Sequence, residues 1–366
     1  MPNISVLIKP ASGMCNLQCR YCFYHDEVKN RKVESYGFMS EETLENVIQK
    51  TLDFSDTACS FTYQGGEPLL RGIDFFKKSV ELQKKYNTKG LKILNAVQTN
   101  ATCLNDEWAE LFKQNNFLTG VSLDGILFSH DSFRIDSKGD GTFERVMEGI
   151  ELLKKHKVDY NILTVVNALT AKKIPQIYEF YKQNDFAYLQ FIPCLNPLYK
   201  EKECYPYTLT PKAYGHFLKT LFDLWYKDVK EGLILHIQQF EEYVKMLLLM
   251  PIDVCGMSGV CSSQNVIEAD GEVYPCDFYM LDEYKLGNLN KSSFMEINKK
   301  REEIRFIEES EKIHDDCKCC KYMSICRGGC RRHRMPKNYF CSSYYEFFDY
   351  TINRLEEIAE LYKKIY

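Results

Sequence analysis

The sequence predicts an α/β protein, a partial (β/α)6 TIM-like barrel followed by a cysteine-rich domain. Short apolar runs alternate with helical patterns over about the first 200 of the 366 residues, as in parallel β/α units. Six such units are fewer than the eight that close a barrel. Nine of the 16 cysteines lie between Cys255 and Cys341. We therefore expect two domains, residues 1–235 and residues 236–366.

The six expected strands are short runs rich in apolar residues, a pattern typical of strands buried on both faces. They cover residues 5–8, 58–63, 91–98, 117–122, 160–166 and 188–192. Parallel strands joined by right-handed crossovers curl into an open sheet or a barrel.

Helix starts can be recognised between these strands. Ser40 and Asn105 are each followed by two acidic residues, the pattern of an N-cap with acids in the first helical turn. Apolar residues recur at spacings of three and four over residues 143–155, which predicts a helix there. Residues 211–250 look all-helical. After Cys255 we expect no helix before about residues 344–366, because turn residues crowd this part of the chain.

The composition is ordinary for a globular protein, with 45% hydrophobic and 27% charged residues. The N-terminus lacks the basic and apolar segments of a secretion signal, and no run approaches the ~20 apolar residues of a membrane span. We therefore expect a cytoplasmic protein without membrane contact, whose cysteines are thiols or metal ligands. The formal net charge of −4 gives no reason to expect a nucleic acid partner.

The first cysteine constellation lies in the loop after the first strand. Cys15, Cys19 and Cys22 form a C-x3-C-x2-C array, and three thiolates this close can hold three irons of a [4Fe–4S] cube. The fourth iron then has no cysteine and stays open to another ligand. A structural zinc site with His25 as fourth ligand is the alternative.

The second constellation lies in the C-terminal part. Eight cysteines are enough for two four-cysteine sites, and their spacing alone also allows a pair of zinc ribbons. The eight are Cys255, Cys261, Cys276, Cys317, Cys320, Cys326, Cys330 and Cys341. A ninth, Cys319, is expected to be a bystander. Four cysteines without ligand spacing are expected to be buried like small apolar residues, namely Cys59, Cys103, Cys194 and Cys204.

The loop array, with the aromatic Tyr21 before its last cysteine, resembles the signature of the radical S-adenosylmethionine superfamily. The resemblance implies that Cys15, Cys19 and Cys22 bind a [4Fe–4S] cluster whose open iron takes the methionine end of S-adenosylmethionine. Reductive cleavage of that cofactor then gives a 5′-deoxyadenosyl radical.

Motifs that follow the strands add to this resemblance. Gln64-Gly-Gly-Glu-Pro68, after the second strand, resembles the family's GGEP motif. Gly65 and Gly66 are expected to let the backbone approach the cofactor, and Glu67 to place a negative charge near its ammonium group. Gln98-Thr-Asn100 and Ser122-Leu-Asp124-Gly125 follow the third and fourth strands, at the end where barrel enzymes place their chemistry.

The C-terminal part resembles the SPASM extension of radical enzymes that modify peptides, through Pro275-Cys-Asp-Phe-Tyr279 and the spacing of the last cysteines. Over essentially its full length the chain is similar to the anaerobic sulfatase-maturating enzymes. This similarity implies two auxiliary [4Fe–4S] clusters, three in all. It assigns Cys255, Cys261, Cys276 and Cys330 to one auxiliary cluster, Cys317, Cys320, Cys326 and Cys341 to the other, and Tyr21, Gly66, Ser122, Arg134 and Leu195 to the S-adenosylmethionine site.

The similarity also implies an activity, the conversion of a Cys or Ser residue of a sulfatase into Cα-formylglycine. Asp277 would take the proton, and the auxiliary clusters would take the electron. The implied partners are a sulfatase segment of the type Cys/Ser-x-Pro/Ala-x-Arg and a flavodoxin- or ferredoxin-type electron donor. Ala101, Ile126 and Asp131 depart from the family pattern, which leaves the peptide specificity open.

Two other functions stay open at this point. One is a peptide maturase that forms thioether or carbon–carbon crosslinks in a ribosomal peptide. The other is a non-catalytic zinc or electron-transfer protein. Asp277, next to the expected cluster ligand Cys276, favours formylglycine formation over the crosslinking maturase. Iron content and the release of 5′-deoxyadenosine would separate both enzymes from the non-catalytic protein.

Overall fold

The computed structural model describes residues 3–198, 205–233 and 235–363. Its strands are β1 (Ile4–Ile8), β2 (Ala58–Tyr63), β3 (Lys92–Thr99), β4 (Phe117–Ser122), β5 (Tyr160–Val166), β6 (Tyr188–Pro193), β7 (His236–Ile237), β8 (Asn265–Ile267), β9 (Glu272–Tyr274) and β10 (Gly287–Asn288). They form one sheet in the order β10-β9-β8-β1-β2-β3-β4-β5-β6-β7. Neighbours from β8 to β7 pair in parallel, whereas β9 and β10 are antiparallel.

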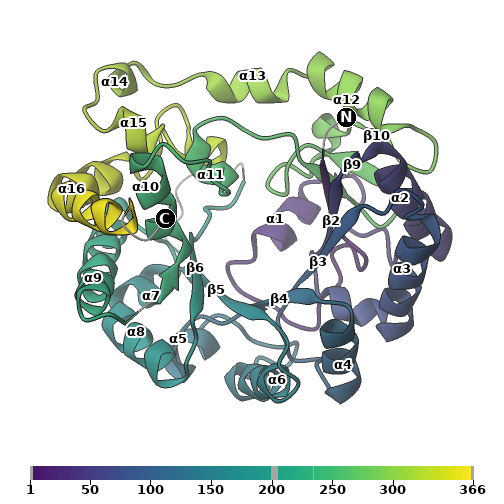
Figure 1. Cartoon of the computed structure of the whole chain (residues 1–366), viewed down its shortest axis with the longest axis horizontal. Helices are drawn as coiled ribbons and strands as arrows, with labels where there is room; N and C mark the ends of the chain where they lie inside the picture. The colour runs from purple at the N-terminus through teal and green to yellow at the C-terminus, as the bar shows by residue number, and fades with distance from the viewer. Residues whose placement is uncertain (1–2, 199–204, 234, 364–366) are drawn as a thin grey trace.

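The predicted fold class is confirmed. Strands β1 to β6 curve into an open ring with helices on its outer side (Figure 1). β2, β4 and β5 have the predicted bounds, and the other three predicted strands differ by one residue at one or both ends. The apolar runs therefore located the barrel wall correctly. The strands are not buried on both faces as expected, however, because burial alternates along β1, β2 and β5.

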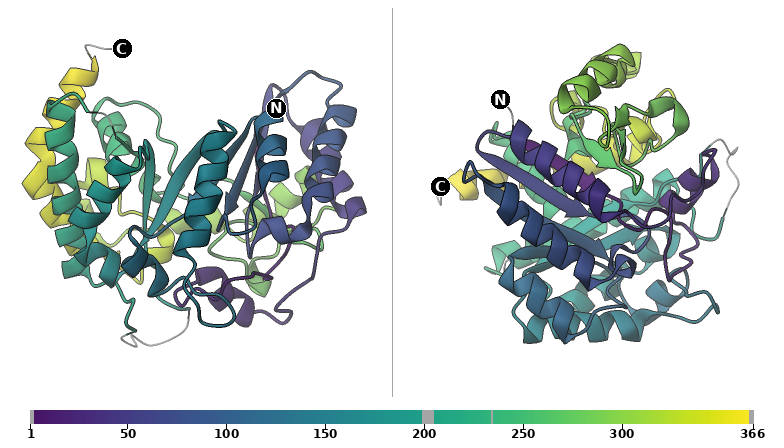
Figure 2. Two further views of the ribbon diagram at one scale, coloured as in Figure 1. Left: turned by 90° about the horizontal axis from the view of Figure 1, so that it is seen from below. Right: turned by 90° about the vertical axis from the view of Figure 1, so that its right-hand side faces the viewer.

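Helices cover the outer side of the ring and extend beyond it. They are α1 (Phe23–Lys29), α2 (Glu41–Phe54), α3 (Ile73–Tyr86), α4 (Asp106–Gln114), α5 (Leu127–Asp131), α6 (Phe143–Lys155), α7 (Ala168–Lys172), α8 (Ile174–Gln183), α9 (Pro211–Lys230), α10 (Gln238–Leu247), α11 (Cys255–Ser258), α12 (Phe294–Glu303), α13 (Phe306–Glu311), α14 (Asp315–Lys318), α15 (Met323–Cys326) and α16 (Cys341–Lys363). Helices α12 to α14 cross the open side of the ring from one end of the sheet to the other (Figure 1). In Figure 2, α12 and α13 lie outside the first strands of the sheet.

The predicted N-caps are present. The Ser40 side chain accepts a hydrogen bond from the backbone N–H of Thr43, and the Asn105 side chain accepts one from that of Trp108. Each cap satisfies an amide that the helix leaves unpaired. Helix α6 has the predicted bounds.

Two predictions about the second half were wrong. Residues 211–250 are not all-helical, because β7 separates α9 from α10 and pairs with β6. Helices α12 to α15 lie in the stretch where no helix was expected. The start of α12 carries a capping box, in which Ser293 and Glu296 bond each other's backbone amides, and this Ser-x-x-Glu pattern is visible in the sequence.

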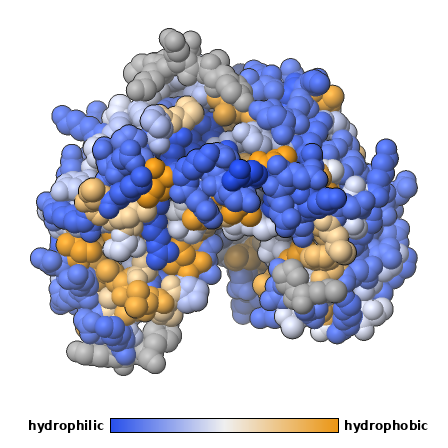
Figure 3. All heavy atoms as spheres, turned by 90° about the horizontal axis from the view of Figure 1, so that it is seen from above, coloured by the Kyte–Doolittle hydropathy of each residue, from blue (hydrophilic) through white to orange (hydrophobic). Residues whose placement is uncertain are grey.

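The main core lies between the sheet and the outer helices. A smaller apolar cluster packs α1 against the strands of the second half, through Tyr24, Val28, Val266, Tyr274 and Met280. Figure 3 shows one face hollowed between two lobes, with hydrophobic residues inside the hollow. Within the described ranges no helix has the length and apolar character needed to cross a membrane.

Candidate active site

Three thiols of one loop share a cavity. Cys15, Cys19 and Cys22 lie between the end of β1 and the start of α1. All three line a cavity of about 210 Å³ at the carboxyl ends of the barrel strands, and they also border a second cavity of about 860 Å³. The loop therefore presents all three thiols to the same cavities, which fits a bound cluster.

Burial governs the chemistry of these thiols. It raises the pKa of Cys19 to about 12, and it raises the pKa of Cys15 and of Cys22 as well. Three thiolates are stable here only with a compensating positive charge, which the irons of a cluster supply. The backbone N–H of Leu17 donates to Cys15 Sγ at 3.3 Å, a contact of the kind that tunes a cluster thiolate.

The same 210 Å³ cavity gathers most of the predicted site. Its walls come from the cysteine loop, from the turn after β2, from β3 to β6 near their carboxyl ends, and from the segment after β9. The predicted residues that line it are Cys15, Cys19, Tyr21, Cys22, Gly65, Gly66, Ser122, Arg134, Leu195 and Asp277.

The two glycines after β2 have separate steric roles. Gly65 and Gly66 have φ values of +96° and +48°. A Cβ at Gly66 would lie 2.0 Å from the carbonyl oxygen of Met14 in the cysteine loop, and a Cβ at Gly65 would lie 2.0 Å from Cδ of Lys9. The glycines thus let this turn touch the loop and Lys9. Their approach to a cofactor stays a prediction.

Glu67 is buried, and three donors hold its carboxylate. Oε1 accepts hydrogen bonds from the N–H of Leu69 at 3.1 Å and the hydroxyl of Thr99 at 2.7 Å, and Oε2 accepts one from the N–H of Asn100 at 2.8 Å. Burial raises the pKa of Glu67 to about 7, although these bonds lower it. The carboxylate joins the turn after β2 to the end of β3. Its predicted place near the cofactor's ammonium group stays a prediction.

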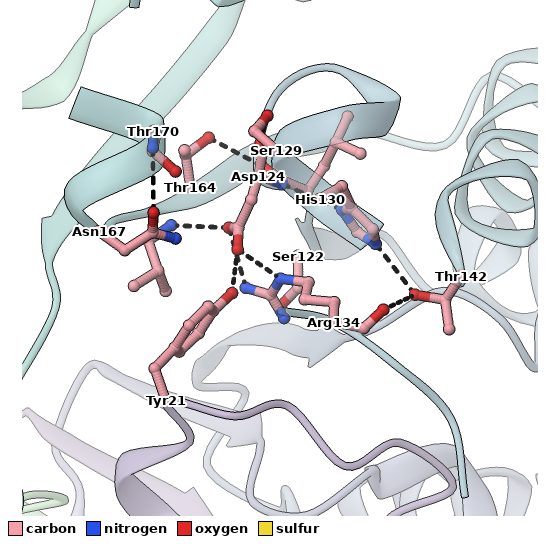
Figure 4. Close-up of polar contacts among 12 residues, drawn as sticks. Tyr21, Ser122, Asp124, Ser129, His130, Arg134, Thr142, Thr164, Asn167 and Thr170 are labelled. Carbon is pink, nitrogen blue, oxygen red and sulfur yellow. Dashed lines mark hydrogen bonds and ion pairs between the residues drawn. The ribbon is translucent and has the colours of Figure 1, made fainter. Parts of the chain in front are cut away.

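Asp124, just beyond β4, is the centre of a buried polar network (Figure 4). Its carboxylate accepts hydrogen bonds from the hydroxyl of Tyr21 and from the backbone N–H of Val165, the latter at 2.9 Å. Arg134 Nη2 donates to Oδ1 at 3.2 Å, and Arg134 Nε lies 3.0 Å from Oδ2. Asp124 therefore fixes two residues, Tyr21 and Arg134, that were predicted to line the cofactor site.

Asp277 reaches the cavity from the second half of the chain, just after β9. Lys9 Nζ donates to its Oδ1, and Gln64 Nε2 donates to its Oδ2 at 3.0 Å. The carboxylate thus lies where the carboxyl ends of β1 and β2 meet the cysteine loop. A carboxylate at such a position can accept a proton from a group bound in the cavity.

Cys255, Cys261, Cys276 and Cys330, the four cysteines assigned to one auxiliary cluster by resemblance, lie near one another. Cys276 lies within electrostatic reach of Cys261 and Cys330, and Cys330 within reach of Cys255 and Cys261. Backbone N–H groups donate to three of the sulfurs at 3.4–3.5 Å, those of Cys255, Cys276 and Cys330. Burial raises the pKa of Cys330 to about 11. This donor set fits a cluster that compensates buried thiolates.

The other four line a separate cavity of about 240 Å³, formed with residues of α14 to α16. They are Cys317, Cys320, Cys326 and Cys341. Cys319 is exposed, as expected of a bystander. Among the residues that the structure describes, no three His, Cys, Asp or Glu side chains converge as ligands of a single metal ion would. In a [4Fe–4S] cube each iron takes its own thiolate, so the ligands surround the cube.

Comparison with known proteins identifies the family. The model of the radical SAM superfamily matches residues 10–181, and that of SPASM, an iron–sulfur cluster-binding domain, matches residues 255–321. A cysteine-type anaerobic sulfatase-maturating enzyme of Clostridium perfringens (strain 13 / Type A) is 47% identical, over 98% of this chain and 99% of that enzyme. The chain belongs to the anaerobic sulfatase-maturating enzymes.

Other relatives agree with this sulfatase-maturating family. A serine-type anaerobic sulfatase-maturating enzyme of Bacteroides thetaiotaomicron is 36% identical, over 94% of this chain and 89% of its own. The solved structure of native anSMEcpe with bound AdoMet and the Cp18Cys peptide superposes with a TM-score of 0.94, at 46% identity over 98% of this chain and 99% of that chain. The predicted enzyme class and the predicted cofactor classes, iron–sulfur clusters and S-adenosylmethionine, are thereby confirmed.

Sequence reasoning missed several residues of this sulfatase-maturating site. Gln64 begins a recognised motif and Lys9 directly follows β1, but nothing local shows that their side chains meet Asp277. Cys194, expected to be only a packing residue, is buried and also lines the 210 Å³ cavity. Cys103 is half-buried rather than buried, and its sulfur accepts a hydrogen bond from Asn16 Nδ2 at 3.6 Å. Cys59 is buried as expected, whereas Cys204 lies outside the described residues.

Proposed function

We propose that this enzyme oxidises a cysteine residue of a sulfatase to Cα-formylglycine. The observation that carries the proposal is the 210 Å³ cavity, which the three loop thiols, the predicted cofactor-lining residues and Asp277 line together. The residues expected to hold the radical-generating centre and the candidate base therefore face one cavity. Such an arrangement suits the removal of a hydrogen atom and a proton from neighbouring atoms of one side chain.

The balance of the reaction is simple. A cysteine side chain loses one hydrogen atom from Cβ, one proton from sulfur and one electron to give a thioaldehyde, and water then replaces sulfur as sulfide to leave the aldehyde. When bound, S-adenosylmethionine and the clusters supply the 5′-deoxyadenosyl radical that takes the hydrogen atom, and they accept the electron. The protein positions the substrate and takes the proton.

Asp277 is the proposed proton acceptor. Its side chain is 13% exposed, so that it faces the cavity without being open to bulk solvent. Lys9 and Gln64 hold its two oxygens in fixed positions, and each oxygen keeps a second lone pair for a substrate thiol. The carboxylate is therefore oriented before the substrate binds.

The preference for cysteine rests on relatives. The relatives with cysteine-type names are 44–47% identical to this chain, whereas the serine-type relatives are 32–36% identical. We propose a substrate segment of the type Cys-x-Pro/Ala-x-Arg and reduction by a flavodoxin- or ferredoxin-type protein. We also propose a cytoplasmic location, because the cluster thiols must stay reduced.

The test uses two peptides that differ at one residue. The reconstituted enzyme is incubated without oxygen with S-adenosylmethionine, dithionite and a peptide carrying Cys-x-Pro-x-Arg or Ser-x-Pro-x-Arg, and the products are analysed by mass spectrometry. We expect an aldehyde from the Cys peptide, formed faster than from the Ser peptide. Cleavage of S-adenosylmethionine with both peptides unchanged would contradict the proposed function.

A further inference from the structure

Lys9 carries a buried positive charge beside the proposed base. Its side chain has no exposed surface, and its Nζ donates to Asp277 Oδ1. Burying an ammonium group costs several kcal/mol unless a partner of opposite charge compensates it. A lysine is therefore tolerated at this position because Asp277 is there, and the two residues lie 268 positions apart in the chain.

The aromatic ring of Tyr24 is a second contact of the Lys9 ammonium group. Its Nζ lies 4.3 Å from the centre of the Tyr24 ring, at a distance where the ring face attracts a cation. The Tyr24 hydroxyl donates to Glu268 Oε2 at 2.8 Å, and Glu268 in turn pairs with Arg31 at 2.7 Å. Because this ring is anchored at its far end, it offers the ammonium group a fixed surface.

The GGEP-type turn leaves room for the stem of the lysine. A Cβ at Gly65 would lie 2.0 Å from Cδ and 3.0 Å from Cε of Lys9, so any other residue at this position would displace the side chain. The first glycine of a motif that resembles a cofactor-binding signature thus also maintains the path from Lys9 to Asp277.

Two adjacent strands supply the two donors. Ile8 of β1 and Tyr63 of β2 are paired in the sheet, and Lys9 and Gln64 directly follow them. Their Nζ and Nε2 atoms contact different oxygens of Asp277. The sheet register therefore fixes the spacing of the donors and with it the orientation of the carboxylate.

Of the two carboxyl groups near Lys9, Asp277 is its ion-pair partner. Glu27 is a second buried carboxyl group in this region. Burial, followed by the charge of Asp277, raises the pKa of Glu27 well above its usual range, which favours its neutral form. Lys9 and Asp277 then form a neutral ion pair. A proton that moves from a substrate thiol to Asp277 would leave the lysine charge to offset the charge on sulfur.

We propose that Lys9 is a positioning residue for peptide oxidation, which orients Asp277 and offsets the negative charge on the substrate sulfur as its proton leaves. This inference rests on the proposed function, since it assumes that Asp277 takes the proton. It concerns the step after the hydrogen atom has left Cβ, so binding of the peptide and removal of that hydrogen should not depend on Lys9.

The test compares Lys9→Met, Asp277→Asn and the double variant, with Lys50→Met as matched control. Lys50 is partly buried, and its Nζ donates to the backbone carbonyls of Leu289 and Ser292 rather than to a carboxylate. The peptide carries a cysteine with two deuterium atoms on Cβ. We would measure iron per chain, peptide Kd by fluorescence anisotropy, deuterium transferred to 5′-deoxyadenosine, and formylglycine.

Lys9→Met should lower the rate of formylglycine formation at least about tenfold, with iron content, peptide Kd and deuterium transfer within about twofold of the unmodified enzyme. In the double variant both charges of the pair are absent, so Lys9→Met should add less than about a twofold effect to that of Asp277→Asn alone. Lys50→Met should leave all four quantities unchanged.

Three results would overturn the inference. The first is formylglycine formation by Lys9→Met within twofold of the unmodified enzyme. The second is that Lys9→Met loses both peptide binding and deuterium transfer. The third is that the double variant forms formylglycine a further tenfold more slowly than Asp277→Asn. Failure of the proposed function has a different signature, because the unmodified enzyme itself would then make no formylglycine.

Discussion

Asp124 and Arg134 form a buried ion pair in which the guanidinium contacts both carboxylate oxygens, with Nε 3.0 Å from Oδ2 and Nη2 3.2 Å from Oδ1. Arg134 lines the cavity and Asp124 does not. Asp124 should therefore affect cofactor binding through the position of Arg134. Asp124→Asn should weaken S-adenosylmethionine binding about tenfold, or about 1.4 kcal/mol, because the guanidinium loses its charged anchor. Equilibrium dialysis against labelled cofactor measures this affinity.

Asp228→Asn is the matched control for that substitution. Asp228 is also buried and accepts a hydrogen bond from a tyrosine, Tyr178, while pairing with a cation, Lys182. Breaking a buried pair costs about 3–5 kcal/mol of stability, so both variants should unfold more easily. Only Asp124→Asn should lose cofactor affinity. An equal loss in the two variants would mean that the effect is one of general stability.

His130 makes the stability of the barrel sensitive to acid. Its Nδ1 accepts a hydrogen bond from the backbone N–H of Asp124 at 3.2 Å, and its Nε2 lies 3.0 Å from Thr142 Oγ1. Burial lowers the pKa of His130 from 6.5 to about 3. The unfolded chain therefore binds a proton below about pH 6.5 that the folded chain does not, and stability falls as the pH decreases from 6.5 toward 3.

His130→Gln should remove this one-proton contribution. Between pH 6.5 and 5, the free energy of unfolding of the variant should fall less steeply, by up to about 1.4 kcal/mol per pH unit. Anaerobic urea unfolding at several pH values measures the slope. Identical slopes for the two proteins would show that this histidine is protonated in the folded state.

Cys319 and Cys320 are adjacent, but they should differ in their effect on iron content. Cys320 lines the 240 Å³ cavity with three other cysteines, whereas Cys319 is exposed. Cys320→Ala should lose up to about four irons per chain, the content of one cube. Cys319→Ala should keep its full iron content. Iron analysis of the two purified variants decides the assignment, which is wrong if both lose the same amount.

Asp277→Asn should separate radical formation from peptide oxidation. The amide keeps the size of the side chain but accepts a proton far less readily, so 5′-deoxyadenosine should still form while formylglycine falls about 10²-fold or more. Asp282→Asn, nearby in the chain, is the control, because Asp282 bonds the backbone of Lys32 and pairs with Lys285. Full product formation by Asp277→Asn would remove Asp277 from the mechanism.

The barrel could be predicted because its signals are local. Each of β1 to β6 has at least five residues and is rich in apolar ones, so that it can be distinguished from the polar segments around it. Strand β8 has three residues, and it exists because it pairs with β1 some 260 positions earlier in the chain. Three residues are too few to indicate a pairing with so distant a strand. The sequence analysis therefore did not predict β8.

The site residues also divide into those whose signal is local in sequence and those whose contacts join distant segments. The three loop thiols are neighbours in sequence, so their spacing alone indicates a cluster. The contacts of Asp277 join segments more than 200 residues apart, and only the folded chain shows them. The glycine after Gln64 was expected to approach the cofactor, whereas its nearest side chain is that of Lys9, a steric relation that cannot be read from a motif.

The most direct test of the proposed function is the stoichiometry of the reaction with the Cys peptide. Formylglycine, sulfide and 5′-deoxyadenosine are quantified in the same anaerobic reaction. We predict that the three products form in equal amounts, because each oxidised cysteine gives up one hydrogen atom to the cofactor and then its sulfur to water. A peptide that loses two hydrogens but keeps its sulfur, with no release of sulfide, would contradict the proposal and indicate a crosslinking enzyme.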